Sequence, residues 1–204
     1  MGKSILPRGS RNGFTLMETM FAIFILSVGV LALAALMSRS SADTERSRYM
    51  ATATLLASEK LEDLNRYSVN DPVIAVTSGT TAGSLTSDSG PSTVTVGGVT
   101  ENVAYFDTVR TSSGNGAVSE TLTGVNGGGT TQYTTVTQTP DGNNTSATST
   151  TAPTASADSL IYNRRWIIEK DTPVVGVRRI TVLVTLQNGP TTAPVSFQTS
   201  MVRP

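Results

Sequence analysis

The spacing of hydrophobic residues changes along the 204-residue chain, and each spacing predicts a different element. From Phe14 to Met37 most positions are apolar, and Glu18 is the only charged residue. A helix of this length extends about 36 Å, which exceeds the roughly 30 Å hydrocarbon thickness of a bilayer. We therefore predict a stem helix over residues 14–37 that is long enough to cross a membrane.

After residue 37 the apolar residues follow one side of a helix. They recur at spacings of three, four or sums of these, and most charged residues fall between them. No proline interrupts the stretch, and Asp71-Pro72 ends the region. We predict one continuous helix from Phe14 to about Arg66, whose second half packs on a globular head. The apolar positions of this half are Ala42, Tyr49, Ala53, Leu56, Leu61 and Leu64.

The last 45 residues alternate between the two faces of strands. Turn residues at 171–176 and 188–194 divide them into three strands. Strands joined by short turns form an antiparallel meander, and we expect residues 49–64 of the helix to cover its apolar face. Trp166 is then a core residue rather than a binding aromatic. The face positions are Tyr162, Arg164, Trp166 and Ile168, then Ile180, Val182, Val184 and Leu186, then Val195, Phe197, Thr199 and Met201.

Residues 68–159 are rich in threonine, serine, glycine and asparagine. Gly97-Gly98 lies between two strand-like pieces and signals a hairpin. Residues 140–159 have no apolar periodicity, so we interpret them as a long loop. The strand-like pieces are residues 92–96, 99–109 and 132–139. Together these patterns predict an α+β fold in which one long N-terminal helix packs on an antiparallel β-sheet.

The composition narrows the possible functions. Lysine plus arginine and aspartate plus glutamate number 15 each, and the chain has no cysteine and no histidine. It therefore lacks the thiol nucleophile, the usual general base, the soft metal ligands and any disulfide. With no catalytic triad, metal or phosphate-loop pattern either, we expect neither an enzyme nor a bound cofactor. Between Arg66 and Arg164 the only cation is Arg110, which argues against nucleic acid as a partner.

The first thirteen residues are basic, with Lys3, Arg8 and Arg11 and no acid. Positive charge before an apolar helix predicts a cytoplasmic N-terminus, with the remainder of the chain across the membrane. A secretory signal peptide has the same layout, and Ala32-Leu33-Ala34 would then serve as its cleavage site.

Glu18 favours a membrane helix over a secretory signal. A carboxylate in the bilayer core costs about 2.5 to 3.5 kcal/mol and needs a partner. If the chain were cut after Gly13, the new α-amino group of Phe14 would lie one helical turn from Glu18. That amine could pair with Glu18 in the same helix or in a packed copy, and the second geometry would make the pair an assembly device.

The residues Gly13-Phe14-Thr15-Leu16-Met17-Glu18 resemble the class III signal of type IV prepilins and type II secretion pseudopilins. The resemblance implies that a membrane-embedded prepilin peptidase cleaves after Gly13 and methylates Phe14. It also implies that Glu18 pairs with the N-terminus of a neighbouring subunit in a filament. The expected parts of this pilin-like fold are a leader (1–13), a transmembrane stem (14–37), an amphipathic helix (38–67), a Ser/Thr/Gly-rich variable region (68–159) and the C-terminal meander (160–204).

Within that superfamily, residues 22–34 and the last strands are similar to PilV-like minor pilins, the type IV pilus modification proteins. The implied function is a minor pilin that primes or joins filament assembly. The implied partners are the prepilin peptidase, other major and minor pilins through the N-terminal helix, and the inner-membrane assembly platform. The protein would cross the bacterial inner membrane once, with a cytoplasmic N-terminus and a periplasmic head, and would then enter a pilus or pseudopilus.

Two other functions stay open at this point. The first is an I-type minor pseudopilin of a type II secretion system, because its N-terminal helix is nearly the same. The second is a pilin whose Ser/Thr-rich head binds a surface, a sugar or DNA, although the scarcity of cations argues against DNA.

Overall fold

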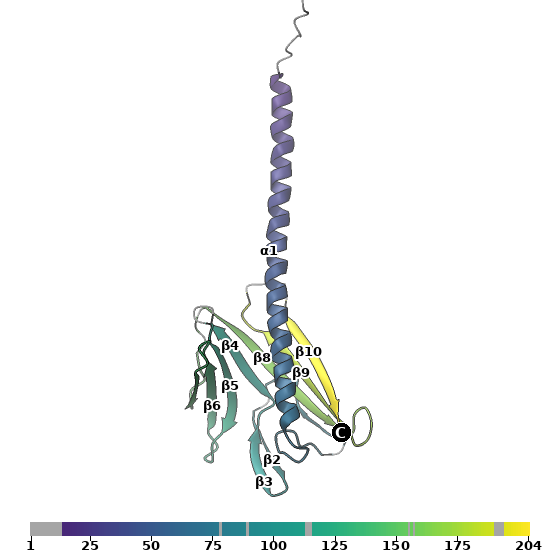
Figure 1. Cartoon of the computed structure of the whole chain (residues 1–204), viewed down its shortest axis with the longest axis vertical. Helices are drawn as coiled ribbons and strands as arrows, with labels where there is room; N and C mark the ends of the chain where they lie inside the picture. The colour runs from purple at the N-terminus through teal and green to yellow at the C-terminus, as the bar shows by residue number, and fades with distance from the viewer. Residues whose placement is uncertain are drawn as a thin grey trace, which may run out of the picture. The chain divides into compact units, whose positions relative to one another are not determined.

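The computed structural model describes residues 14–77, 79–88, 90–112, 116–154, 156, 158–189 and 194–204 (Figure 1). The chain divides into two compact units, residues 1–45 and residues 46–204. The predicted leader, residues 1–13, lies outside the described residues. Its boundary after Gly13 therefore stays a prediction.

Helix α1, Leu16–Arg66, is a single helix of 51 residues. Its first part lies in the unit of residues 1–45, and it is long and apolar enough to cross a membrane. The hydroxyl of Ser27 donates a 2.8 Å hydrogen bond to the carbonyl oxygen of Ile23, one turn earlier. This bond satisfies the hydroxyl inside the helix, which an apolar surrounding requires.

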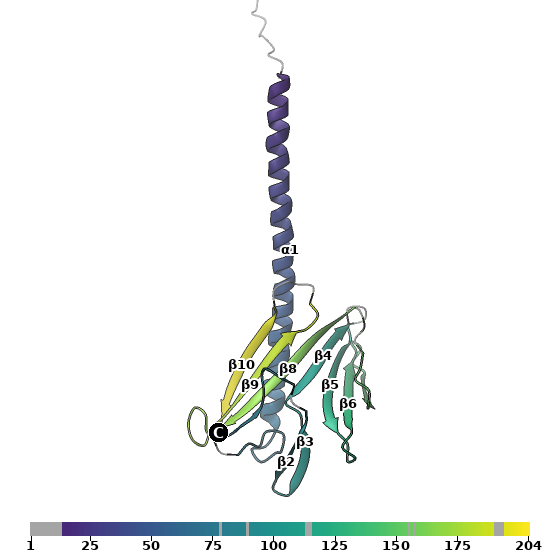
Figure 2. The ribbon, with the colours of Figure 1, turned by 180° about the vertical axis from the view of Figure 1, so that it is seen from behind.

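The unit of residues 46–204 contains an antiparallel sheet of eight strands in the order β10-β9-β8-β4-β5-β6-β7, with β1 also paired to β8 (Figures 1 and 2). A separate hairpin joins β2 to β3. Strand β8 is central because β9 lines one of its edges, while β4 and then β1 share the other. The strands are β1 (Thr81–Gly83), β2 (Ser92–Val96), β3 (Val99–Val103), β4 (Phe106–Ser112), β5 (Val118–Val125), β6 (Thr131–Gln138), β7 (Asn144–Ser149), β8 (Ser159–Lys170), β9 (Arg178–Leu186) and β10 (Ser196–Arg203).

The last three strands form an antiparallel meander, with Trp166 opposite Val182 and Val184 opposite Phe197. Trp166 is buried in the core. The second half of α1 packs against this sheet, so the α+β fold with a long helix on antiparallel strands is confirmed. Its buried residues are Ala53, Leu56, Ala57, Lys60 and Leu64.

One predicted contact position of α1 was wrong, because Ala42 is exposed. Tyr49 and Leu61 are partly buried, and Leu61 packs against the core. Ala57 and Lys60 are buried as well. A hydrophobicity pattern classes lysine as polar, so it did not identify Lys60 as an inward position.

The predicted strand over residues 99–109 is two strands in different sheets. The chain leaves β3 and passes through Ala104-Tyr105 into β4. At this crossing the backbone N–H of Trp166 donates a hydrogen bond to the Tyr105 carbonyl oxygen at 3.0 Å. Gly83 lies beside this crossing with a φ of 85°, and a Cβ there would come within 2.2 Å of the Trp166 oxygen. Alternation of residues continues through the break, so the sequence pattern did not reveal it.

The loop predicted over residues 140–159 contains strand β7, and β1 and β5 were also not predicted. All six residues of β7 are exposed, so the strand has no buried face and no apolar alternation. It pairs with β6 through its backbone, and the hydroxyls of Thr134 and Thr148 lie 3.3 Å apart across the pair. Backbone pairing of this kind leaves almost no signal in a hydrophobicity pattern.

We predict that Leu56→Ala destabilises the head, because Leu56 is buried between α1 and the sheet. Truncating a buried leucine costs about 2 to 5 kcal/mol. Urea unfolding of a fragment beginning at Arg39 measures the loss. Leu55→Ala is the matched control: its side chain is 67% exposed, and surface changes stay within about 0.5 kcal/mol. Equal losses for the two variants would contradict the observed helix face.

Candidate assembly segment and buried charge cluster

The start of α1 carries a helix cap. The backbone N–H of Glu18 donates to Oγ1 of Thr15 at 3.3 Å, and the N–H of Thr19 donates to the Thr15 carbonyl oxygen at 3.2 Å. A threonine followed three residues later by glutamate is the capping-box pattern. Glu18 therefore lies in the first turn, where the helix dipole favours a negative charge.

Of the sequence-predicted residues, Phe14 and Glu18 lie at this helix start, whereas Gly13 is outside the described residues. Phe14 is 81% exposed. Large apolar side chains continue exposed along the first unit, and such a surface marks an interaction or membrane site. They include Leu16, Met17, Met20, Phe21, Ile23, Phe24, Ile25, Leu26, Val28, Val30, Leu31, Leu33, Leu36 and Met37.

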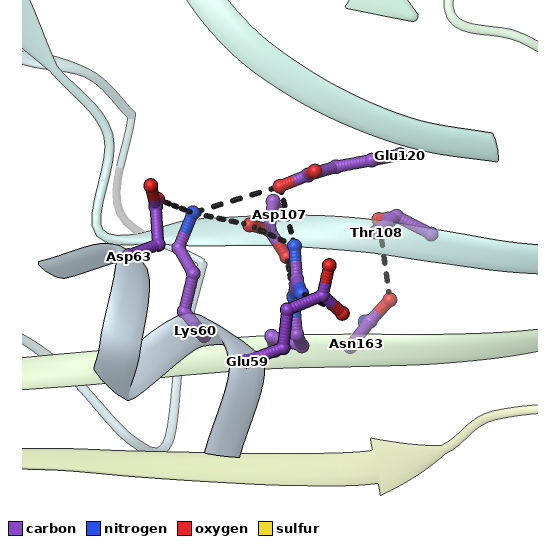
Figure 3. A network of polar contacts seen from close by, with 8 residues as sticks. Glu59, Lys60, Asp63, Asp107, Thr108, Glu120 and Asn163 are labelled. Carbon is purple, nitrogen blue, oxygen red and sulfur yellow. Dashed lines mark hydrogen bonds and ion pairs between the residues drawn. The ribbon is translucent and has the colours of Figure 1, made fainter. Parts of the chain in front are cut away.

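The head contains a second polar feature that the sequence did not predict, the buried charge cluster of Lys60, Asp107, Glu120 and Arg164 (Figure 3). These four residues come from α1, β4, β5 and β8. The Lys60 ammonium lies 3.0 Å from Asp107 Oδ2 and 3.6 Å from a carboxylate oxygen of Glu120. The cluster thus ties the helix to three neighbouring strands.

Arg164 holds Asp107 with two hydrogen bonds. Its Nε donates to Oδ1 at 2.6 Å, and its Nη2 donates to Oδ2 at 2.9 Å and also to Glu120 Oε1. Such a two-pronged pair is among the strongest charged contacts in proteins. Lys60 also lies over the ring of Trp166, 4.5 Å from its centroid, which adds a cation–π contact.

The cluster is buried at its centre and open at one side. Lys60, Asp107 and Arg164 are each at most 5% exposed. Glu59 and Asp63, which flank Lys60 on α1, lie at the open side and reach Arg164 at 3.9 Å and Lys60 at 3.7 Å (Figure 3). The hollow there measures about 210 Å³, and all of its lining residues are charged: Glu59, Lys60, Glu62, Asp63, Arg66, Glu120 and Arg164.

The surroundings shift the pKa values of the cluster in different directions. Burial raises the pKa of Asp107, but Lys60 and Arg164 outweigh it and hold that pKa below its ordinary value. Burial lowers the pKa of Lys60, but Asp107 and Glu120 outweigh it, so that pKa is raised. For Glu120, burial and the nearby charge of Asp107 raise the pKa despite Arg164.

This arrangement suits a structural role. Each cation of the cluster is bound by carboxylates, and each carboxylate by cations. Among the residues that the structure describes, no group of three or more histidine, cysteine, aspartate or glutamate side chains is placed to hold a metal ion. The contacts between the charges join α1 to strands β4, β5 and β8.

One signal in the sequence pointed toward this cluster. Arg164 occupies an inward position of its strand, between Tyr162 and Trp166. Lys60 likewise follows Leu56 at the spacing of a buried helix face and precedes Leu64. A charge at an inward position requires a buried partner of opposite sign. The partners, Asp107 and Glu120, lie in the region of weak pattern and were identified only by the fold.

Residues 8–34 match the family model described as the prokaryotic N-terminal methylation motif. The match covers Arg8 and Arg11 before the stem, the helix cap and most of the apolar part of α1. It supports a type IV pilin-like or pseudopilin protein. No curated protein and no solved structure matches the chain.

We predict that Asp107→Asn destabilises the head at pH 7 by about 3 to 5 kcal/mol, because it leaves two buried cations without their shared anion. Glu120→Gln should cost less, since Glu120 is partly exposed and burial already opposes its charge. Urea unfolding of both variants and the parent fragment measures the difference. A larger loss for Glu120→Gln would contradict the assigned centre of the cluster.

The same measurement has a defined pH dependence. The pKa of Asp107 is lowered in the folded protein, so its stabilising effect is present above its ordinary pKa of about 4 and is lost as pH falls through the folded value. The parent should therefore lose stability below about pH 4, and Asp107→Asn should show a shallower acid slope. The raised pKa of Glu120 acts in the opposite sense: its effect on stability is complete below its ordinary pKa and is lost as pH rises through the folded value, so it does not enter the loss below about pH 4.

Proposed function

We propose that this chain is a minor pilin, a structural subunit that primes or joins the assembly of a type IV pilus. The observation that carries the proposal is the methylation motif at residues 8–34, which ends within the exposed apolar part of α1. A pilin requires a helix that first resides in lipid and then packs against other subunits. The exposed stem and the compact unit of residues 46–204 support this use.

Processing follows from the position of the motif. Prepilin peptidase would cleave between Gly13 and Phe14 and methylate the new amino group of Phe14. Removal of the leader deletes Lys3, Arg8 and Arg11, the positive charges that set the orientation of the stem during insertion.

Assembly would use Glu18 and the apolar surface of the stem. In an apolar surrounding a carboxylate needs a cation, and the amino group of Phe14 of a neighbouring subunit would supply one. Glu18 also has a local role, because it occupies the acidic position of the capping box. A test of assembly must therefore separate its charge from its effect on the helix start.

The proposed partners are the prepilin peptidase, other major and minor pilins through α1, and the inner-membrane assembly platform. The proposed location is the inner membrane, with a cytoplasmic N-terminus and a periplasmic head, followed by the pilus. An I-type pseudopilin of a type II secretion system is the second candidate, because the matched motif supports pilin-like and pseudopilin proteins alike. Genes adjacent to this one distinguish the two systems.

We predict that the mature chain begins with methylated Phe14. Mass spectrometry of the N-terminal peptide, from protein purified out of its native host, measures both the cleavage position and the methyl group. The expected N-terminal peptide begins at Phe14 and carries one methyl group on its amino nitrogen, which makes it heavier than the same peptide without the modification. A mature chain that begins near Ala35 would instead indicate a secretory signal and overturn the proposal.

We predict that Glu18→Gln leaves membrane insertion and cleavage intact but lowers incorporation into filaments. Glutamine also suits the capping box, so this variant removes the charge while retaining the helix start. Thr15→Ala is the control that removes the cap and keeps the charge. The ratio of the chain in sheared filaments to that in membranes is the readout. Normal incorporation of Glu18→Gln would show that the amine pairing is unnecessary.

A further inference from the structure

Three cations lie in a row across one corner of the sheet, where β8 and β10 end and β9 begins (Figure 2). Arg178 at the start of β9 is directly opposite both Lys170 of β8 and Arg203 of β10. Directly opposite residues of antiparallel strands have their side chains on the same face, with Cβ atoms about 5 Å apart. Like charges in this arrangement destabilise a sheet, so this cation row calls for a compensating negative charge.

Arg178 is the most deeply buried member of the cation row. It is 6% exposed and lies on the face of β9 that carries Ile180 and Val182 into the core. No carboxylate among the described residues forms an ion pair with any of the three cations. Burial and the nearby charge of Arg203 lower the pKa of Arg178. A buried charge without a counter-ion is costly, which points to an anion from outside the described part of the chain.

The end of α1 compensates only part of this charge. Nη1 of Arg203 donates to the carbonyl oxygens of Asn65 and Tyr67, each at 3.1 Å. Nη1 of Arg178 donates to the Val69 carbonyl oxygen at 2.6 Å. The end of a helix carries about half a negative charge, which is much less than three cations require. Nε and Nη2 of Arg178 make no hydrogen bond to the described residues, and this edge of a guanidinium can hold a carboxylate by two hydrogen bonds.

A hollow of about 220 Å³ lies beside the cation row, and Arg178 and Lys170 both line it. None of its lining residues is acidic. Thr77 and Thr95 supply hydroxyl groups, and most of the remaining wall is apolar. The apolar lining residues are Val69, Ala75, Val76, Val94 and Val96. The hollow therefore combines two cations with a wall of short aliphatic side chains.

We propose that this hollow binds an organic carboxylate. Its carboxylate group lies on Arg178 and Lys170 and supplies the missing counter-ion, while its aliphatic part lies against the valines. An inorganic phosphate would satisfy the charge but has no apolar part to place against that wall. The proposal goes beyond the assembly of a filament, because it concerns the head alone and uses no residue of the methylation motif.

A ligand-detected NMR titration of the full-length protein in non-ionic detergent tests the proposal, with acetate and valerate as probes at low ionic strength. We expect saturable binding of both, with valerate about tenfold tighter because part of its aliphatic chain leaves water. Lys170→Gln removes one charge and should weaken valerate binding several-fold. Arg179→Gln is the matched control: Arg179 lies on the opposite face of β9, paired with Glu169 at 2.6 Å, so its loss should leave the affinity unchanged.

Arg178→Lys tests the two-pronged contact. A lysine retains the charge but cannot present two parallel donors to a carboxylate, so the affinity for valerate should fall about tenfold. A far-UV circular dichroism spectrum checks that each variant folds. If Arg178→Lys does not fold, the comparison of Lys170→Gln with Arg179→Gln still decides the proposal.

Three results would overturn the proposed site. Without saturable binding of valerate, the two arginines serve only to cap the end of α1. Equal losses for Lys170→Gln and Arg179→Gln would place the binding elsewhere or reduce it to an effect of total charge. Tighter binding of inorganic phosphate than of valerate would exclude the organic carboxylate as the preferred ligand and indicate an inorganic anion.

Discussion

The ion pairs among Lys60, Asp107 and Arg164 are the contact on which the arrangement of the head depends. They bring together α1, β4 and β8, which are far apart in the sequence. Burying three charges is costly, and hydrophobic residues of similar size often give equal stability. The gain is therefore in geometry: the Lys60 ammonium has to face Asp107, so this contact sets how α1 is rotated on the sheet.

That rotation decides what the other side of α1 presents. With Leu56, Lys60 and Leu64 against the sheet, exposed residues such as Arg48, Leu55 and Glu62 lie on the opposite side of the helix. In the first unit the helix instead exposes apolar side chains all around. One continuous helix thus has a stem suited to lipid or other apolar helices, followed by a half that is anchored on one side and polar on the other.

The sheet shows two modes of stabilisation. Strands β8 and β9 consist of buried and partly buried residues, which alternate along most of β8, and both strands share the core with α1. Strands β5, β6 and β7 bury little and are paired through the backbone and through hydroxyls, as between Ser119 and Thr137 at 2.8 Å and between Thr121 and Thr135 at 3.1 Å. The second mode needs no apolar residues, so it tolerates a Ser/Thr-rich sequence.

The sequence by itself determined the parts whose signal is local: the apolar stem, the unbroken helix to Arg66, the Gly97-Gly98 hairpin and the C-terminal meander. Each of these elements is indicated by a regular spacing of apolar residues or by turn residues next to it in the sequence. Only the tertiary structure decided that Lys60 is buried, that the chain changes sheet at Tyr105, and that residues 144–149 form a strand. The reason is physical: a buried charge, a sheet crossing and an exposed strand are each stabilised by partners distant in sequence, and no periodicity records them.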